Sequence, residues 1–211
     1  MAFKVKQALL PLKRIYNAVQ SLSQRLRGIL AYVIPGKYIP MTQLLICVNL
    51  FIFVLQQINR SVTELFVHRS NVWYSYLTAC FLHGNVRHLA GNMLFFSFIV
   101  PQIEKKYGSY FLLIAYIITG IIGSMLMSFY LPHVRSLGAS GSISGLMMIW
   151  IFHNIMEGRP FLVIAALFWF MREGVLSGIG LIKPDGIGHL AHFGSALGGF
   201  FFLPLVVYLR K

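Results

Sequence analysis

One serine and one histidine in this sequence have surroundings that suit a nucleophile and its base. Ser140 follows Gly138 and Ala139 in the stretch RSLGASGSISGLMMIWIF, where an apolar helix is expected to begin. Free backbone N–H groups and the positive dipole at a helix N-terminus stabilise an anion. A serine hydroxyl is a poor nucleophile until a base removes its proton. His192 is the natural base if its helix contacts the helix of Ser140, so we expect the two side chains to meet.

Small residues beside both side chains favour this contact. Gly141 and Gly145 follow Ser140 at four-residue spacing, and Gly199 lies on nearly the same helical face as His192. Further small residues follow the histidine in the stretch GHLAHFGSALGGF: Gly194, Ser195 and Gly198. Such residues let two helix backbones approach closely within a membrane.

Two more serines, Ser142 and Ser144, lie in the same stretch as Ser140. We expect them to pack against neighbouring helices, because serines inside helices bond back to backbone carbonyls.

The stretch FLHGNVRHLAGN, from Phe81 to Asn92, offers groups that could stabilise negative charge. His88 and Asn92 are four residues apart and share a helical face, while His83 is expected in the loop before that helix. A histidine can shuttle protons or bind metal, and a neutral amide can donate to a developing oxyanion. Bonds to neighbouring helices are the alternative role for these side chains.

Carboxylates that could orient His192 are scarce. None of the five acidic residues lies within one helical turn of His192; they are Glu64, Glu104, Glu157, Glu173 and Asp185. We therefore expect a serine–histidine dyad rather than a triad with an acid.

The composition is that of an integral membrane protein. The 211 residues are 57% hydrophobic and 11% charged, with a mean hydropathy of +0.73. Six continuous apolar stretches come near the ~20 residues that cross a bilayer as a helix: 41–57, 84–101, 110–131, 140–156, 161–181 and 187–208. The fold class is therefore an all-α bundle of six transmembrane helices. The runs are continuous rather than alternating, which argues against a β-barrel.

The basic residues indicate an orientation in the membrane. The net charge of +13 could suggest a nucleic-acid partner, but the acid-free first forty residues hold seven of the eighteen lysines and arginines. With this basic tail in the cytoplasm, twelve of the eighteen basic residues lie inside and six lie outside or in the membrane, so both termini are expected inside. The second, fourth and sixth helices then run from outside to inside. Five polar side chains would then lie in the outer turns of these helices and face the bundle interior or a water-filled cavity. They are His88, Asn92, Ser140, His189 and His192.

Residues 1–40 are expected to form a tail, and residues 41–211 the six-helix domain. The tail suits an anionic membrane surface, a transit peptide or a plain solvated segment, and the sequence leaves these open. The short chain favours a bacterial inner membrane, while the tail keeps an organelle membrane open. Cys47 and Cys80 are expected to be small buried side chains rather than disulfide or metal ligands.

At these motifs the sequence resembles the rhomboid intramembrane serine proteases. The resemblance rests on FLHGNVRHLAGN, on GASG (138–141) and on AHFGSALGG (191–199), in that order, and EKKYGS (104–109) resembles a Glu-x-x-x-Gly turn of the family. It covers about residues 41–208. Two departures stand out: Trp73-Tyr74 replaces a Trp-Arg pair of the first loop, and Ser195 replaces a glycine after the histidine.

The resemblance implies a mechanism and its residues. Ser140 would attack the peptide carbonyl, His192 would act as general base and then acid, and His88, Asn92 and the Ser140 backbone N–H would bind the oxyanion. His83, Gly138, Gly141 and Gly199 would support them. Single-pass membrane proteins would be cleaved near the outer face within the lipid bilayer, with no metal and no cofactor.

Other functions were weighed against this one. An inactive relative that binds membrane-protein clients is the main alternative, although both dyad residues are present. A metalloenzyme built on the histidines lacks a His-Glu-x-x-His motif and a nearby acidic ligand. A transporter would need paired charges or broken helices at the midplane. The natural substrate and the oligomeric state are not encoded in any motif that we can identify.

Overall fold

The computed structural model describes residues 40–159 and 188–209, together with residues 164, 168, 171, 172 and 175 between them. The described chain is all-helical. In order, its helices are α3 (Met41–Ile58), α4 (Ser61–Phe66), α5 (Ser75–Thr78), the 3-10 turn η1 (Ala79–Phe81), α6 (Val86–Tyr107), α7 (Ser109–Tyr130), α8 (Ser140–Met156), α10 (His189–Phe200) and α11 (Leu203–Leu209).

Five of the six expected apolar stretches coincide with these helices, and the sixth helix is bent. The fifth stretch, 161–181, and the tail before residue 40 lie outside the described residues. By length and composition, α3 and α7 can each cross a membrane, and α10 with α11 adds a third span if the 42° bend between them lies within one crossing. The all-α membrane bundle is thus confirmed, while the count of six spans stays a prediction.

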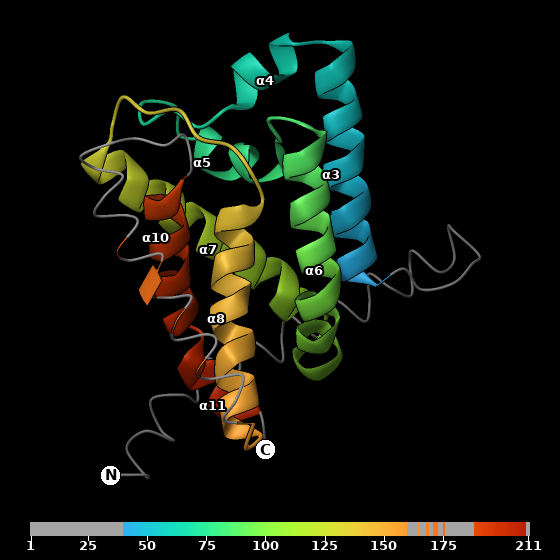
Figure 1. Cartoon of the computed structure of the whole chain (residues 1–211), viewed down its shortest axis with the longest axis vertical. Coiled ribbons are helices and arrows are strands. Elements are labelled where there is room, and N and C mark those ends of the chain that lie inside the picture. Colours follow the sequence, from blue (N-terminus) through green and yellow to red (C-terminus); the bar gives the residue numbers. More distant parts are fainter. Residues whose placement is uncertain are drawn as a thin grey trace.

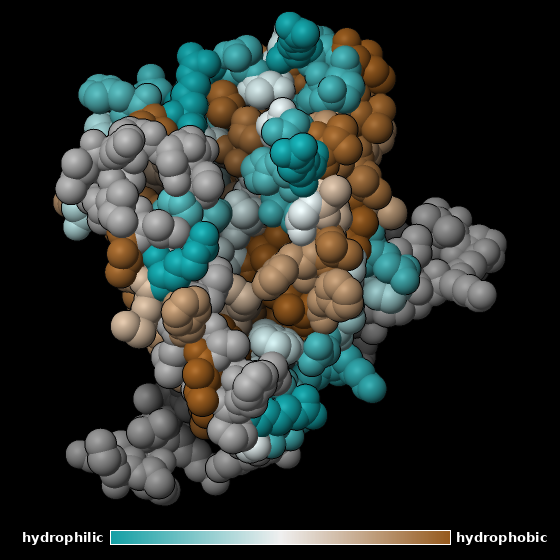
Figure 2. Space-filling model, viewed as in Figure 1, coloured by the Kyte–Doolittle hydropathy of each residue, from teal (hydrophilic) through white to brown (hydrophobic). Residues whose placement is uncertain are grey.

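From α3 through α6 and α7 to α8, successive long helices alternate in direction, and α10 runs the same way as α8 (Figure 1). In that view α3 and α7 run upward, and α6, α8 and α10 run downward, so the first turns of the last three helices share the upper half with α4 and α5. Figure 2 shows apolar side chains over the middle of the visible face, with polar ones gathered toward its upper and lower ends. This distribution fits a bundle that lies across a bilayer.

The turn between α6 and α7 also fixes α3. Gly108 has a positive φ of 90°, which favours glycine. The Glu104 carboxylate just before it accepts hydrogen bonds from Met41 N (2.6 Å) and from both Thr42 N (2.9 Å) and Thr42 Oγ1 (2.6 Å). It also accepts one from Ser109 Oγ (2.6 Å). A single carboxylate thereby caps the N-terminus of α3, where a negative charge is stabilising, and bonds the first side chain of α7.

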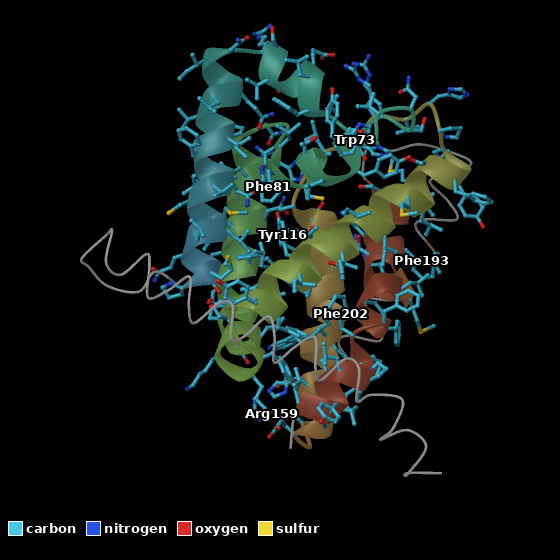
Figure 3. All side chains as sticks on the ribbon, turned by 180° about the vertical axis from the view of Figure 1, so that it is seen from behind. Trp73, Phe81, Tyr116, Arg159, Phe193 and Phe202 are labelled. Carbon is cyan, nitrogen blue, oxygen red and sulfur yellow. The ribbon has the colours of Figure 1, made fainter. Side chains whose placement is uncertain are left out.

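The centre of the bundle is closely packed. Figure 3 shows Tyr116 at mid-height, with Phe81 above it and Phe202 below. Tyr116 is fully buried, and its hydroxyl donates to the Cys80 carbonyl oxygen at 2.7 Å. Both cysteines are free thiols; Cys80 is buried as expected, whereas Cys47 is exposed, contrary to the expectation of burial. Cys47 lies on a face of α3 that the described residues leave uncovered.

The tightest helix contact joins α7 to α10. A Cβ atom added to Gly123 would collide with Ser195 Oγ and the Ala191 carbonyl oxygen. On α10, a Cβ on Gly194 would lie 2.8 Å from Leu126 Cβ and 3.3 Å from Gly123 Cα. The two backbones touch because glycine occupies both sides of the contact. This contact sets the position of α10, the helix that carries His192.

We predict that Gly123→Ala lowers the thermal unfolding temperature in detergent, because the new methyl group must separate α7 from α10. Overpacking of this kind costs about 1–3 kcal/mol. Gly91→Ala on α6 is the matched control, since a Cβ there meets no atom within 4 Å and alanine favours the helix. Equal unfolding temperatures for the two variants would contradict the assigned contact.

Candidate active site

Ser140 and His192 form a direct hydrogen bond. The distance between Ser140 Oγ and His192 Nε2 is 2.8 Å, which confirms the contact expected from the sequence. Ser140 is the first residue of α8, and His192 lies in the first turn of α10, where its backbone N–H donates to Gly188 O at 2.9 Å. The geometry lets the imidazole accept the serine proton if Nε2 is unprotonated.

Glycines between α8 and α10 allow this short distance. A Cβ on Gly141 would lie 3.1 Å from Ser195 Oγ, and one on Gly199 would lie 2.6 Å from the Gly145 carbonyl oxygen. The expected close approach is therefore confirmed at Gly141 and Gly199, whereas a Cβ on Gly145 would collide with Thr119 of α7. Ser195 stands where the family resemblance predicts a glycine, and its side chain fits because it faces Gly123 of α7 and Gly141 of α8.

The turn before Ser140 has a conformation that only glycine adopts readily. Gly138 has φ +134°, and a Cβ there would lie 2.9 Å from His88 Nε2 and 3.4 Å from Ser140 Oγ. The His88 ring and the Ser140 hydroxyl thus both lie beside Gly138, on the side where a Cβ would project. The Gly138 backbone N–H donates to Ala79 O at 2.9 Å, which ties this turn to the segment before α6.

Asn92 is held by His83. The Asn92 Nδ2 to His83 Nε2 distance is 3.0 Å, and His83 lies in the loop before α6, as expected, with 2% exposure. The amide N–H donates to His83 Nε2 when the ring proton is on Nδ1. The second N–H of the Asn92 amide can then serve a ligand in the cavity beside it.

Gln56 is a residue of this network that the sequence analysis missed. Its side chain accepts from His83 N (3.0 Å) and donates to His83 O (3.2 Å), closing two bonds on one residue. Gln56 is 4% exposed at the end of α3. The available signal was an amide in a strongly apolar stretch, where a polar group needs a partner.

The other two serines of α8 play packing roles, as expected. Ser144 Oγ donates to the Ser140 carbonyl oxygen at 2.8 Å, which is the back-bonding geometry. Ser142 is fully buried against Gly120 of α7. Its hydroxyl has no hydrogen-bond partner among the described residues, so it packs without the expected carbonyl bond.

A cavity of about 700 Å³ opens beside the dyad. Its lining comes from α6, α7, α8, α10 and the 131–139 segment, and it includes the polar residues His88, Asn92, Ser140, His189 and His192. The expectation that three helices bring their polar side chains to one region is confirmed. A smaller cavity of about 240 Å³ on the other side also touches Asn92, Ser140 and His192.

Most acidic residues of the described chain are engaged away from the dyad. Glu64 pairs with Arg69 and Arg135, and Glu104 caps the start of α3. Glu157 Oε1 lies 4.0 Å from Lys106 Nζ. Glu173 and Asp185 lie outside the described residues. Among the described residues no group of three or more histidine, cysteine or acidic side chains is arranged to hold a metal ion.

The structure is that of a helical membrane protein in which a serine and a histidine from two helices form a direct hydrogen bond. The Rhomboid domain family model matches residues 70–209. This match covers more than half of the chain, and the chain belongs to the rhomboid family.

Named relatives agree with this assignment. The chain is 29% identical over 171 residues to Rhomboid-like protein 11, chloroplastic, of Arabidopsis thaliana, covering 74% of this chain and 61% of the relative. It is 33% identical over 139 residues to RHOMBOID-like protein 4 of the same plant, and this match covers 64% of this chain and 34% of the relative. It is 29% identical over 171 residues to Rhomboid protease GluP of Bacillus subtilis (strain 168), and this match covers 76% of this chain and 33% of the relative.

The chain therefore spans less than two thirds of the length of these relatives. The family assignment and the apolar helices identify an integral membrane protein. Relatives named from a chloroplast and from a bacterium both match, so the membrane compartment and the orientation of the termini stay predictions.

We predict that lowering the pH from about 6.5 to about 4 destabilises the fold through His83. Burial first, and the neighbouring His88 charge second, lower the pKa of His83 to about 4. An unfolded chain binds this proton near pH 6.5, so below that pH protonation favours the unfolded state until the folded ring also titrates. Unfolding temperatures in detergent across this range measure the effect.

His83→Asn should flatten this pH dependence, leaving the part due to His68, whose pKa is also lowered by burial. His133→Asn is the control, because His133 is exposed. A profile that His83→Asn leaves unchanged would show that His83 is not the group responsible.

Proposed function

We propose that this protein is an intramembrane serine endopeptidase that cleaves transmembrane protein substrates near the outer face of the membrane. The observation that carries this proposal is the 2.8 Å hydrogen bond between Ser140 Oγ and His192 Nε2 at the edge of a 700 Å³ cavity. The protease named among the relatives supports it. The chain and this protease belong to the rhomboid family. Ser140 and His192 would supply the nucleophile and the base.

The proposed reaction has two steps. In the first, Ser140 Oγ attacks the peptide carbonyl carbon while His192 Nε2 takes the hydroxyl proton, and the same proton passes to the leaving amine when the C–N bond breaks. In the second, His192 takes a proton from water, whose oxygen attacks the acyl carbon and releases Ser140. Every proton that leaves an attacking oxygen is returned to a leaving group by the same imidazole.

The developing oxyanion would be stabilised by donors on two helices. The Ser140 backbone N–H lies at the start of α8, where helix N–H groups lack intrahelical partners. The His88 ring and Ser140 Oγ both lie beside Gly138. His88 and Asn92 line the same cavity as Ser140. Donors held in place before the reaction stabilise the transition state without reorganisation. His83 and Gln56 position Asn92 and do not touch the substrate in this proposal.

The orientation follows from the polarity of the helices. The dyad lies at the N-terminal turns of α8 and α10, and the opposite ends carry Lys105, Lys106 and Arg159; Figure 3 shows Arg159 at the end away from Trp73. If basic residues face the cytoplasm, the dyad faces outward and both termini of the chain are cytoplasmic. A transmembrane substrate would then be cut close to the outer surface.

We predict that Ser140→Ala and His192→Ala each lower the cleavage rate of a transmembrane model substrate by several orders of magnitude, about 10³-fold or more. A fluorophosphonate should label Ser140 in the wild type and fail to label it in His192→Ala. Peptide mapping locates the label. Ser144→Ala is the matched control, because Ser144 Oγ bonds back to the helix.

A wild-type protein that binds the substrate without cutting it, and that takes no label, would favour the client-binding alternative. Unchanged cleavage in Ser140→Ala would remove this serine from the mechanism.

We also predict that Asn92→Ala lowers kcat about 10²–10³-fold, the usual loss for one oxyanion donor, with a smaller effect on KM. Asn92→Gln should fail to restore the rate, because its longer side chain places the amide beyond His83. Fluorophosphonate labelling of Asn92→Ala should be slowed but retained, since the dyad is intact. Equal losses in kcat and in substrate affinity would point to binding rather than to oxyanion stabilisation.

A further inference from the structure

Arg135 places a permanent positive charge in the wall of the active-site cavity. It lies in the 131–139 segment that connects α7 to α8 and ends at Ser140. Its side chain lines the same 700 Å³ cavity as Ser140 and His192. An arginine in the wall of this cavity can contact a substrate that occupies it.

The remaining described lining of this cavity contains no carboxylate to neutralise the charge. Its ionisable side chains other than Arg135 and Cys80 are histidines, and the rest are small, apolar or neutral polar residues. A guanidinium group binds a carboxylate through two parallel hydrogen bonds when the geometry allows. The described wall therefore favours an anionic group over a cationic one.

The present partner of Arg135 can be exchanged. Arg135 Nη1 lies 2.8 Å from Glu64 Oε2, but the side chains are 57% and 63% exposed, respectively. Exposed ion pairs contribute little to stability. Glu64 also has a second partner, because Arg69 Nη2 lies 3.4 Å from the same Oε2 atom. If Arg135 turned to a ligand, Glu64 would keep a compensating charge.

We propose that Arg135 determines substrate specificity by pairing with an Asp or Glu side chain close to the cleaved peptide bond. This inference rests on the proposed endopeptidase function and adds the substrate class. In the free protein, Glu64 takes the place of the substrate carboxylate on the guanidinium. On binding, the acidic side chain of the substrate replaces Glu64 on Arg135, and Glu64 stays with Arg69.

A matched series of transmembrane substrates tests the proposal with the full-length protein in liposomes. An Asp is moved one residue at a time along both sides of the cleaved bond, and each position is repeated with Asn and with Lys. At one or two neighbouring positions the wild type should cleave the Asp substrate about fivefold faster in kcat/KM than the Asn substrate, as expected for one partly exposed charge-assisted hydrogen bond. The Lys substrate should be slower still, and added salt should reduce the difference.

Variants assign this preference to the guanidinium. Arg135→Gln removes the positive charge, so the ratio of kcat/KM for the Asp substrate to that for the Asn substrate should fall to about one. Arg135→Glu replaces it with a negative charge, so the Lys substrate should be cleaved faster than the Asp substrate. Arg87→Gln is the matched control, since it removes an exposed arginine in the first turn of α6 that does not line the described cavity; its ratio should equal that of the wild type. Fluorophosphonate labelling of Ser140 verifies that each variant is folded.

The outcomes separate the two proposals. If the wild type cleaves the Asp, Asn and Lys substrates equally at every position, or if Arg135→Gln keeps the preference, the specificity role is wrong while the endopeptidase function stands. If the wild type cleaves no member of the series and Ser140 takes no label, the endopeptidase function itself is wrong.

Discussion

The close contact of three helices at glycine residues is the constraint on which the site depends. Lipid offers no hydrophobic driving force to press one helix against another, so packing and polar contacts must hold the bundle. Gly123 on α7 and Gly141 on α8 each leave room for Ser195 of α10. One serine side chain thus fits into a space made by two glycines on different helices. Because His192 lies three residues earlier on the same helix, the position of this serine fixes the distance from the imidazole to Ser140.

A second set of contacts fixes α6 relative to the dyad. It begins in α3, where Gln56 makes two bonds with the backbone of His83, and it continues from the His83 ring to Asn92. These bonds join α3, the loop before α6 and α6 itself in a region with little access to water, where an unmade hydrogen bond is costly. At the other end of the bundle, Glu104 joins the start of α3 to the start of α7. The first helix is therefore bonded at both ends, although it provides no residue of the dyad.

The sequence predicts the parts of this structure that depend on local pattern. Five continuous apolar stretches predicted the positions of the long helices of the described chain. The small residues beside Ser140 and His192 predicted that these two side chains meet. The sequence does not predict features that depend on a partner far along the chain. Gln56 bonds a residue 27 positions away, and Arg135 pairs with Glu64 across 71 positions. Neither pair follows a helical or strand period, so only the tertiary arrangement makes it visible. The positive φ of Gly138 belongs to the same group, because a glycine in a motif does not reveal its conformation.

The 42° break between α10 and α11 separates two mechanical roles within the last part of the chain. α10 is held at Gly194, Gly198 and Gly199 by contacts with α7 and α8, whereas α11 buries Val206 and packs mainly on α8. Membranes differ in thickness, and helices adapt to that difference by tilting or bending. The bend lies below the histidine, on the far side of the contacts that hold α10. A change of tilt in α11 alone would therefore leave in place the contacts that set the distance from imidazole to hydroxyl.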